Sequence, residues 1–472
     1  MPNPLPATLT HVALLAHSFP PDGEAGVEQY TIRLAHSLVA LGLRVSVICG
    51  RVRVGEPQNT VLREEVDGLS VYGLVQNWPY RDLPEAAVDP ALDRSLDQLL
   101  STLAPDLLAV QSLQGLSWGF LRVAAAQRVP VVLHLHDAFL SCPSGGQRLH
   151  PDGSLCLPVD PTRCGACFDA YRHKEGPLEK ASRWAAAHLP STIPPDSLHK
   201  AFGALPQKLR DGLRALNQRG ARLTRAPSQT LQPPGVDPRV SDRAVAVSEA
   251  LEHVTRVISP SQFLADSVLE DGFELANLVV IETGVPGAKV PLRPDAGQPL
   301  RLLFLGTWVQ HKGPHILAAA LRALTPEEAS RVEARAVGPA PFPQYRDDVE
   351  RLSAGRLEVS GPVPSSEVPG LLINHDVLIV PSIWAENAPL VALEARAMGR
   401  PVIASDLGGL VELIHEGVDG LRFPAGDAVA LVTVLRRLLN EEGLLQRLHE
   451  SVRPPTSEQA WASAMLRAWR ET

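Results

Sequence analysis

The sequence predicts an α/β protein with two doubly wound domains, each built on a parallel sheet. Short apolar strands alternate with helical patterns from His11 onward, which is typical of parallel strands covered by helices. A second series of the same kind begins at Arg301. Between the two series, Val285–Pro299 is rich in Gly, Pro and Asp and is the best linker candidate. Two large domains fit a chain of 472 residues.

The first domain, residues 1–285, is predicted from its opening strand–loop–helix–strand unit. An apolar strand at His11–His17 precedes a Pro/Gly loop at Phe19–Gly26, and a helical pattern then runs to Gly42. Further strands are expected at Arg44–Cys49, Leu107–Val110, Pro130–His136, Arg256–Ser259 and Leu278–Glu282. The alternation breaks down at about residues 140–242, which we interpret as a Cys-rich and helical insertion. Its helical periodicity is modest and is centred on Leu178–Leu189 and Leu205–Leu216.

The second domain, residues 295–455, shows a regular alternation of strands and helices. Its expected elements are a helix at Pro314–Leu324 and strands at Arg301–Leu305, Glu333–Val337, Leu357–Val359, Val377–Val380 and Val402–Ala404. The tail, residues 456–472, carries Trp461, Leu466 and Trp469 on an amphipathic pattern. We expect this tail helix to cross back to the first domain.

Composition excludes several classes of function. A formal net charge of −8 argues against a nucleic-acid partner, which needs a basic face. No apolar run approaches the roughly 20 residues of a transmembrane helix, and the polar N-terminus is unlike a signal peptide. We therefore expect a cytoplasmic protein without a transmembrane segment, compatible with peripheral association at the inner membrane face. Only six basic residues are lysines, so Lys312 in a glycine-flanked motif stands out.

The most informative motifs lie in the second domain. They are Phe304-Leu-Gly306-Thr-Trp-Val-Gln-His-Lys312-Gly313, then Gly338-Pro339, then Pro381-Ser-Ile-Trp-Ala-Glu386 continuing to Glu394, and finally Gly399-Arg-Pro through Asp406-Leu-Gly-Gly409. Their order and spacing resemble glycosyltransferase family 4, whose members are retaining enzymes of the GT-B fold. The resemblance is strong over Arg301–Leu448 and weaker over Thr10–Gly50, Val131–Asp137 and Ser259–Gly284. It implies two Rossmann-like domains facing across a cleft. It also implies transfer of a sugar from a nucleotide-diphosphate sugar to an acceptor hydroxyl on a glycan, a lipid-linked carrier or a small molecule.

The segment between Glu386 and Glu394 predicts an anion site. Pro389 suits the first turn of a helix that Asn387 or Ala388 would cap, and free N–H groups at a helix start bind phosphates. The resemblance implies that Glu394 holds the donor ribose and that Glu386 approaches the transferred sugar. It places the rest of the donor site at Gly26, Gly306, Thr307, Lys312, Gly338, Asn387, Ala388, Pro389 and Leu390. The alternative is a pair of solvated helix carboxylates.

Lys312 would supply positive charge to the departing diphosphate, as a metal ion does in other transferases. We therefore expect no catalytic metal. The family often has Arg directly after the glycine at 306, but Thr307 stands here, so a second cation is absent or comes from elsewhere. An ordinary surface lysine is the alternative.

Two motifs of the first domain complete the expected site. The loop from Pro20 to Glu28 contains Gly23 and Gly26, which would let the backbone approach a ligand closely. His134-Leu-His136-Asp137 ends a buried strand, where open α/β sheets bind ligands. His136 matches the family's active-site histidine, so the resemblance assigns it to the transferred sugar. A structural histidine, or a metal pair with His134 and Asp137, is the alternative.

Four of the five cysteines fall in the insertion, spaced Cys142-x13-Cys156-x7-Cys164-x2-Cys167. The close pair is typical of a metal knuckle, and four thiolates would complete a tetrahedral structural zinc site. An iron–sulfur cluster, or cysteines without any ligand, remains an alternative. Some family 4 relatives carry a similar insertion just after the histidine–aspartate motif. Cys49 lies in an apolar strand and is interpreted as core.

Two other kinds of function are compatible with two such domains and a Cys-rich insertion. A sugar epimerase or phosphorylase also has two such domains, but the Glu386/Glu394 pair argues against the first and the lack of a pyridoxal-phosphate lysine motif against the second. A non-catalytic binding protein, with the Cys-rich insertion as a docking module, has Thr307 as its only support.

Overall fold

The structure is a computed structural model that describes residues 2–53, 55–77, 88–170, 235–293 and 299–470. It divides into two compact units. Unit 1 comprises Met1–Ile258, Ser267–Val279 and Arg467–Thr472, and unit 2 comprises Ser259–Asp266 and Val280–Leu466. The helical patterns expected at Leu178–Leu189 and Leu205–Leu216 lie outside the described residues.

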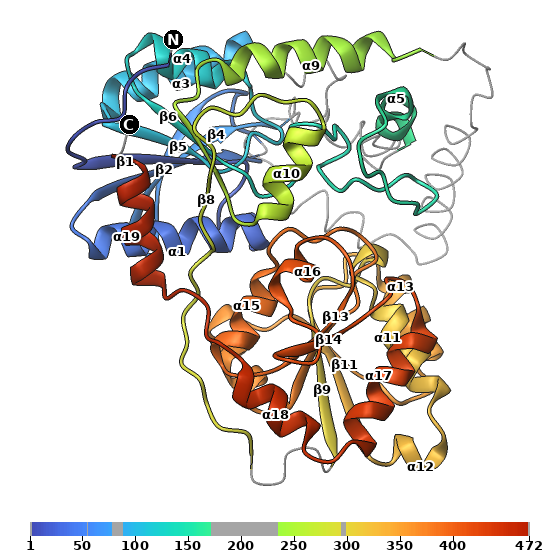
Figure 1. Cartoon of the computed structure of the whole chain (residues 1–472). Helices are drawn as coiled ribbons and strands as arrows, with labels where there is room; N and C mark the ends of the chain where they lie inside the picture. The colour runs from blue at the N-terminus through green and yellow to red at the C-terminus, as the bar shows by residue number, and fades with distance from the viewer. Residues whose placement is uncertain (1, 54, 78–87, 171–234, 294–298, 471–472) are drawn as a thin grey trace. The chain divides into compact units, whose positions relative to one another are not determined.

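Unit 1 is built on a sheet of eight strands in the order β3-β4-β2-β1-β5-β6-β7-β8 (Figure 1). Its strands are β1 (His11–Ala16), β2 (Arg44–Arg51), β3 (Val61–Val66), β4 (Leu69–Val75), β5 (Leu107–Val110), β6 (Val131–His134), β7 (Arg256–Ser259) and β8 (Val279–Val280). The central strands are parallel and completely buried, whereas β3 is antiparallel to β4 and alternates between exposed and half-buried residues. That alternation marks β3 as an edge strand with one solvated face.

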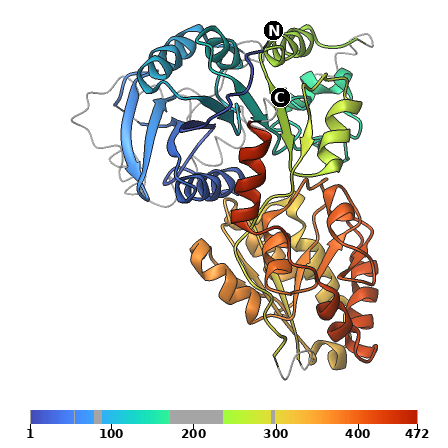
Figure 2. The same ribbon diagram turned by 60° about the vertical axis from the view of Figure 1, so that its left-hand side comes forward.

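Helices cover both faces of the unit 1 sheet. Figures 1 and 2 show α1 on one face, and α3 and α4 together on the other. This is the arrangement that right-handed crossovers produce when the strand order runs in both directions from β1. The helices are α1 (Gly26–Ala40), α3 (Pro90–Leu103), α4 (Gly119–Ala126), α5 (Pro161–Ala170) and α9 (Pro238–Leu251), together with α10 (Gln262–Glu270), which spans the boundary between the units.

Unit 2 has a sheet of six strands in the order β11-β10-β9-β12-β13-β14, with parallel pairing throughout. The strands are β9 (Leu300–Leu305), β10 (Val332–Val337), β11 (Glu358–Ser360), β12 (Val377–Val380), β13 (Val402–Ser405) and β14 (Gly420–Phe423). One face packs on α11 (Pro314–Ala323), α13 (Pro343–Leu352) and α17 (Ala428–Asn440), and the other on α14 (Val368–Ile373) and α15 (Leu390–Ala397). The remaining helices are α12 (Pro326–Ala329), α16 (Gly409–Leu413), α18 (Leu444–Ser451) and α19 (Glu458–Ala468), with 3-10 turns at Gln310–Lys312 and Ser365–Glu367.

The predicted fold class is confirmed, with differences in detail. Each strand expected in the described residues is present, although β8 is only two residues long. β3, β4 and β14 were not predicted from the sequence, and the start of α9 lies inside the predicted insertion. The tail helix is present as α19, and Trp469 just beyond it packs edge-on against His134 in unit 1, with ring centroids 5.8 Å apart.

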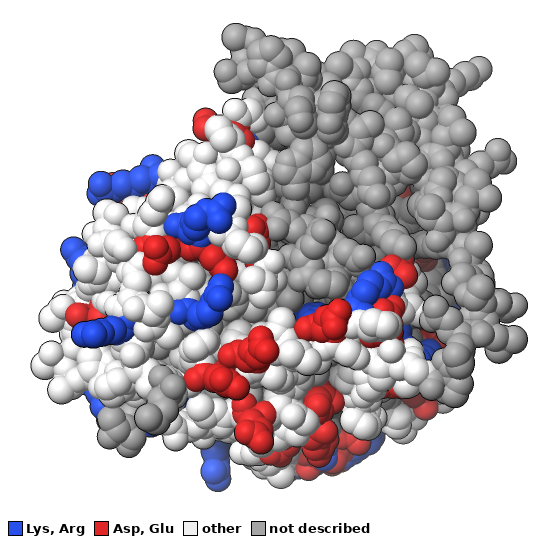
Figure 3. All heavy atoms as spheres, turned by 90° about the horizontal axis from the view of Figure 1, so that it is seen from above, with Lys and Arg blue, Asp and Glu red and all other residues white. Residues whose placement is uncertain are grey.

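The described surface carries charge of both signs. On the face in Figure 3, lysine and arginine side chains are interspersed with acidic ones over the part of the surface that is described. Among the described residues, no helix has the length and apolar character needed to cross a membrane.

Candidate functional site

The loops at the carboxyl edge of the unit 2 sheet are held together through glycine backbone. A Cβ on Gly313 would lie 1.8 Å from the Pro381 carbonyl oxygen, and one on Gly338 would lie 2.0 Å from that of Gly306. A Cβ on Gly409 would lie 1.8 Å from the carbonyl oxygen of Asn387. Four loops from β9, β10, β12 and β13 therefore meet at distances that only glycine permits.

Lys312 and Glu386 meet in this loop cluster. Lys312 ends the 3-10 turn after β9, whereas Glu386 lies in the loop after β12. The Lys312 ammonium donates to both carboxylate oxygens of Glu386, at 2.8 and 3.1 Å. The Glu386 side chain is 5% exposed and that of Lys312 is 29% exposed, so the pair has its anion buried and its cation reaching solvent.

Two neighbours complete the environment of this pair. Ser382 donates its hydroxyl to Glu386 at 2.7 Å, and the Lys312 ammonium lies 4.8 Å from the Trp384 ring centroid, within cation–π range. Burial would raise the pKa of Glu386, but the charge and hydrogen bonds of Lys312, with the Ser382 hydroxyl, more than offset it and lower that pKa. Glu386 is therefore an anion at neutral pH, and Lys312 is its counter-charge.

The other predicted donor residues of unit 2 lie in the loops after β9, β10 and β12 or on α15, whereas Gly26 lies in unit 1. Glu386 precedes α15 and Glu394 lies on it, as expected. The cap assignment was wrong: Pro389 is the N-cap and α15 begins at Leu390, because Pro389 has extended backbone angles of φ −66° and ψ 119°. No side chain caps the first turn of α15, so its N–H groups face the loops. Gly306, Thr307, Asn387, Ala388, Pro389 and Leu390 are all half-buried.

A second group of polar side chains lies at the carboxyl ends of β1, β5 and β6 in unit 1. His136, just past β6, has its Nε2 3.1 Å from Oε1 of Gln111, which follows β5. The Tyr30 ring of α1 stacks edge-on against His136, with centroids 4.4 Å apart, and its hydroxyl lies 3.0 Å from His134 Nδ1. Burial lowers the pKa of His136 to about 3, and the nearby His17 adds to that effect. His136 is therefore a neutral imidazole at physiological pH.

The first loop adds a buried carboxylate to this group. Glu28 on α1 accepts a hydrogen bond from the Ser18 hydroxyl at 2.6 Å and lies 3.2 Å from His17 Nε2. Burial would raise the pKa of Glu28, but the hydrogen bonds from His17 and Ser18 outweigh burial and lower it. Its second oxygen, Oε2, is buried without a hydrogen-bond partner among the described residues. Gly26 begins α1, where a Cβ would meet open space.

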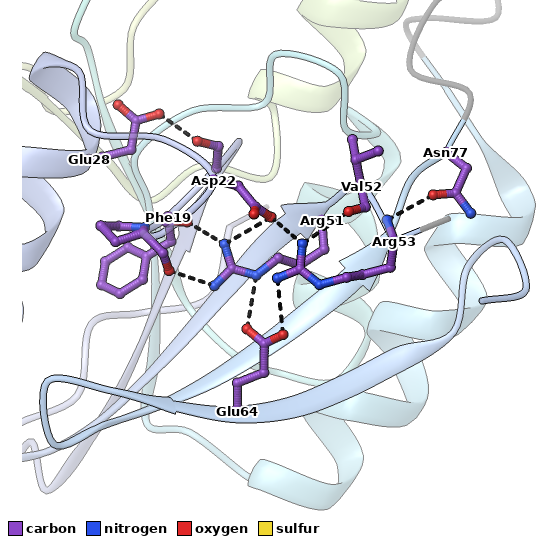
Figure 4. Close-up of polar contacts among 10 residues, drawn as sticks. Phe19, Asp22, Glu28, Arg51, Val52, Arg53, Glu64 and Asn77 are labelled. Carbon is purple, nitrogen blue, oxygen red and sulfur yellow. Dashed lines mark hydrogen bonds and ion pairs between the residues drawn. The ribbon is translucent and has the colours of Figure 1, made fainter. Parts of the chain in front are cut away.

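Arg51 fixes the shape of this loop from beneath (Figure 4). Its side chain is fully buried at the end of β2 and donates to the carbonyl oxygens of Phe19 and of Pro20, the latter at 2.9 Å. It also donates to Glu64 of β3 at 3.1 Å. Arg53 contacts Asp22 and the same Glu64, but its side chain is 28% exposed. The β3–β4 hairpin thus supports the loop through Glu64.

Arg51→Met is expected to destabilise unit 1 by about 3 kcal/mol, because it removes a buried cation, leaves the Phe19 and Pro20 carbonyl groups without their donor, and leaves Glu64 with Arg53 alone. Arg53→Met is the matched control. It should lower the free energy of unfolding by less than about 1 kcal/mol, because the ion pairs of Arg53 are partly exposed. Urea unfolding followed by circular dichroism measures both. Equal losses in the two variants would show that burial of Arg51 does not matter to the loop.

The four predicted metal cysteines are all buried and reduced, and so is Cys49. Among the described residues, no group of three or more His, Cys, Asp or Glu side chains is placed to hold a metal ion. This statement covers both the cysteines and the His134/His136/Asp137 alternative. Metal binding at the cysteines stays a prediction.

Several polar side chains around both candidate sites were not predicted from the sequence. Three of them lie on, or next to, an apolar strand or helix pattern: Tyr30, Gln111 and Ser382. Such a pattern contains no motif that would distinguish these residues. Trp384 lies two residues before Glu386, and that adjacency is the one signal that could have singled it out.

Two family models match the chain. One is described as Glycosyltransferase Family 4 and matches residues 25–187; the other is described as Glycosyl transferases group 1 and matches residues 299–441. The first match covers the His136 region, and the second covers Lys312, Glu386 and Glu394.

Curated relatives match over part of their length. A D-inositol 3-phosphate glycosyltransferase of Xylanimonas cellulosilytica is 31% identical over 266 residues, covering 51% of this chain and 61% of the relative. A glycogen synthase of Mycobacterium tuberculosis is 31% identical over 214 residues, covering 43% of this chain and 50% of the relative. The chain thus spans between half and three fifths of the length of these two relatives.

Solved structures match over nearly the whole chain. Sucrose-phosphate synthase from Thermosynechococcus elongatus has a TM-score of 0.63 at 18% identity, covering 98% of both chains. HepE of Anabaena, solved in complex with UDP and glucose, has a TM-score of 0.61 at 16% identity, covering 98% of this chain and 100% of that one. At this identity the likeness concerns the fold.

Proposed function

The chain belongs to glycosyltransferase family 4 and has the GT-B fold, and on that premise we propose that it is a retaining glycosyltransferase. It would transfer a sugar from a nucleotide-diphosphate sugar to an acceptor hydroxyl. The observation that carries this proposal is the pairing of Lys312 with buried Glu386 beside the uncapped start of α15. A cation, a fixed anion and free N–H groups in one loop cluster suit a diphosphate attached to a sugar.

Each group in unit 2 has a distinct task in the proposed reaction. The α15 amides and Lys312 would stabilise the negative charge that develops on the diphosphate as the bond between the sugar and its phosphate oxygen breaks. Glu394 would bind the donor ribose, and Glu386 would hold a hydroxyl of the transferred sugar. The acceptor hydroxyl would enter on the face that the diphosphate leaves, and its proton would pass to the departing phosphate oxygen.

Unit 1 would supply contacts to the transferred sugar and the acceptor. His136 is neutral, and its Nε2 faces the Gln111 carbonyl oxygen, so Nδ1 is the acceptor nitrogen of the ring. A neutral imidazole suits a hydrogen bond with a sugar hydroxyl better than it suits proton transfer. We propose this hydrogen-bonding role for His136.

No catalytic metal is proposed, because Lys312 supplies the charge that a metal ion would supply elsewhere. The acceptor is proposed to be a carbohydrate or lipid-linked hydroxyl, met in the cytoplasm or at the inner membrane face. Sedimentation with and without lipid vesicles distinguishes a membrane-associated enzyme from one that stays in solution.

A thermal-shift screen with UDP, GDP, ADP and their sugars, run in a chelator, tests the donor proposal. One nucleotide should raise the melting temperature, because ligand at about 100 times its Kd stabilises the native state by about 2.7 kcal/mol. Glu394→Ala should lose roughly ten- to a hundredfold in nucleotide affinity. Glu386→Ala should keep the shift but lose turnover of bound donor.

The outcomes also separate the rival functions. A shift without any release of nucleotide from its sugar would favour a non-catalytic binding protein. Conversion of one nucleotide sugar into another without any acceptor would favour an epimerase. Formation of a sugar phosphate in the presence of inorganic phosphate would favour a phosphorylase. If no nucleotide shifts the parent protein, the donor site is wrongly assigned.

A further inference from the structure

The tail packs against the strand that leads to His136. Trp469 is completely buried in unit 1, and its ring lies edge-on to that of His134, with centroids 5.8 Å apart and ring planes at 71°. His134 is the last residue of β6 and precedes His136 by two positions. Because side chains alternate along a strand, His134 points to the same side of the sheet as Val132. The tail therefore covers this side of β6.

A buried arginine holds the tail in this place. Arg256 lies on β7 directly beside Val132 of β6, so its side chain leaves the sheet on the same side as that of His134. Its guanidinium donates a hydrogen bond to the carbonyl oxygen of Ala468, the residue before Trp469. Arg256 is itself buried, which shields this bond from water. Hydrogen bonds from a charged donor are stronger than those between neutral groups, so the backbone next to Trp469 is firmly placed.

His134 connects the tail to Tyr30 of α1. Its Nδ1 lies 3.0 Å from the Tyr30 hydroxyl, within hydrogen-bond distance. Its other ring nitrogen, Nε2, is buried and has no hydrogen-bond partner among the residues that the structure describes. The bond with Tyr30 is thus the polar contact that orients the His134 ring, and Trp469 is the ring that the tail packs against it.

Tyr30 in turn lies directly against His136. The centroids of these two rings are 4.4 Å apart, closer than the 5.9 Å between the rings of Tyr30 and His134. Gln111 holds one nitrogen of the His136 ring at 3.1 Å, and the Tyr30 ring limits how far the imidazole can tilt. Protein interiors are close-packed and transmit small displacements, so a shift of Tyr30 would change the direction of the His136 ring.

We propose that Trp469 is a positioning residue for His136. It acts through the His134 ring and the Tyr30 hydroxyl, and this inference rests on the hydrogen-bonding role proposed above for His136. A side chain that binds a reacting sugar must be held within about 0.5 Å and about 10–20° of its productive direction. Loss of the Trp469 ring should therefore slow transfer, although no group that touches the substrate is removed.

Trp469→Leu is expected to lower kcat about tenfold with a smaller change in KM, because a misplaced reacting group slows transfer even where binding is kept. Trp469→Phe keeps an aromatic ring and should recover most of that loss. Trp461→Leu is the matched control, because it truncates a fully buried tryptophan of the tail that lies next to Gly284 in unit 2. It should lower stability but keep kcat. Equal losses of kcat in the two leucine variants, measured on protein that circular dichroism shows to be folded, would overturn the proposal.

Tyr30→Phe tests the connection itself. It removes the hydroxyl beside His134, keeps the ring against His136, and should leave the protein folded. We expect a loss of kcat similar to that of Trp469→Leu. The double variant should be no slower than the slower single variant, because both changes break the same chain of contacts. Losses of kcat that multiply in the double variant would show that the two residues act independently and would overturn the connection.

Imidazole NMR signals of the full-length protein, recorded without donor or acceptor, separate this proposal from that of sugar transfer. The ring C–H signal of His136, assigned by its loss in His136→Asn, should move in Trp469→Leu, because the Tyr30 ring against it shifts. The same signal should stay in place in Trp461→Leu. An unmoved His136 signal in Trp469→Leu would overturn the positioning role whether or not the protein transfers sugar. A moved signal in a protein that transfers no sugar would support that role and contradict only the proposed function.

Discussion

Lys312→Ala is expected to lower kcat/KM for the donor by about a hundredfold or more, because it removes the only described side-chain cation paired with Glu386. The same change should lower stability by about 3 kcal/mol, since it leaves the Glu386 carboxylate buried without a counter-charge. Steady-state kinetics and urea unfolding measure the two effects. Lys289→Ala is the matched control, because this lysine of unit 2 donates to the backbone carbonyl oxygens of Glu450 and Val452.

The double variant Lys312→Met/Glu386→Gln separates catalysis from stability. With both charges gone, no buried ion remains, so stability should return to within about 1 kcal/mol of the parent. Activity should stay as low as in Lys312→Ala or fall further, since neither the Lys312 cation nor the carboxylate proposed to bind the sugar is restored. Recovery of activity along with stability would mean that the pair is structural and that the donor phosphate binds elsewhere.

His136→Ala is expected to lower transfer by about a hundredfold while the protein still folds, because the ring contributes a hydrogen bond rather than core volume alone. His11→Ala is the matched control. It removes a buried histidine, bonded to Ser46 at 2.9 Å, from the amino end of β1, where no ligand is expected. His11→Ala should lower the stability of the protein but leave the activity per folded molecule unchanged.

The pH dependence distinguishes the roles of His136 further. Because its pKa falls from about 6.5 in the unfolded chain to about 3 in the fold, only the unfolded state binds a proton between these values. Stability should therefore fall as pH drops from about 6.5, and His136→Asn should weaken that fall. Kinetics that titrate with a pKa near 6 in the parent, and lose that titration in His136→Asn, would contradict the neutral imidazole.

The parallel strands of both units could be predicted because they are fully buried and apolar. β5, β7 and β12 run over the expected residues without any shift. The loop positions of Lys312 and Glu386 could be predicted because glycine and proline mark the ends of the strands and helices around them. What the motif could not give was the direct contact between those two residues, which depends on how the loops after β9 and β12 fold together.

The elements that were missed depend on long-range pairing. β3 carries Arg63, Glu64 and Glu65 in a short segment, so its sequence has too little apolar alternation to indicate a strand. It forms because β4 supplies its hydrogen bonds and because Glu64 meets Arg51. Arg51 itself looks like a solvent-exposed end of β2, and its burial follows only from the loop that lies over it.

The glycine contacts of unit 2 limit which positions around the proposed donor site could change over evolutionary time. Gly313, Gly338 and Gly409 touch neighbouring carbonyl oxygens, so any side chain there would push the loops apart rather than contact a ligand. Adaptation to a different nucleotide or sugar is therefore confined to positions whose side chains have room to vary, and Thr307 and Trp384 are half-buried positions of this kind. A change of side chain at Thr307 would then alter the proposed donor site without disturbing the glycine-held loops around it.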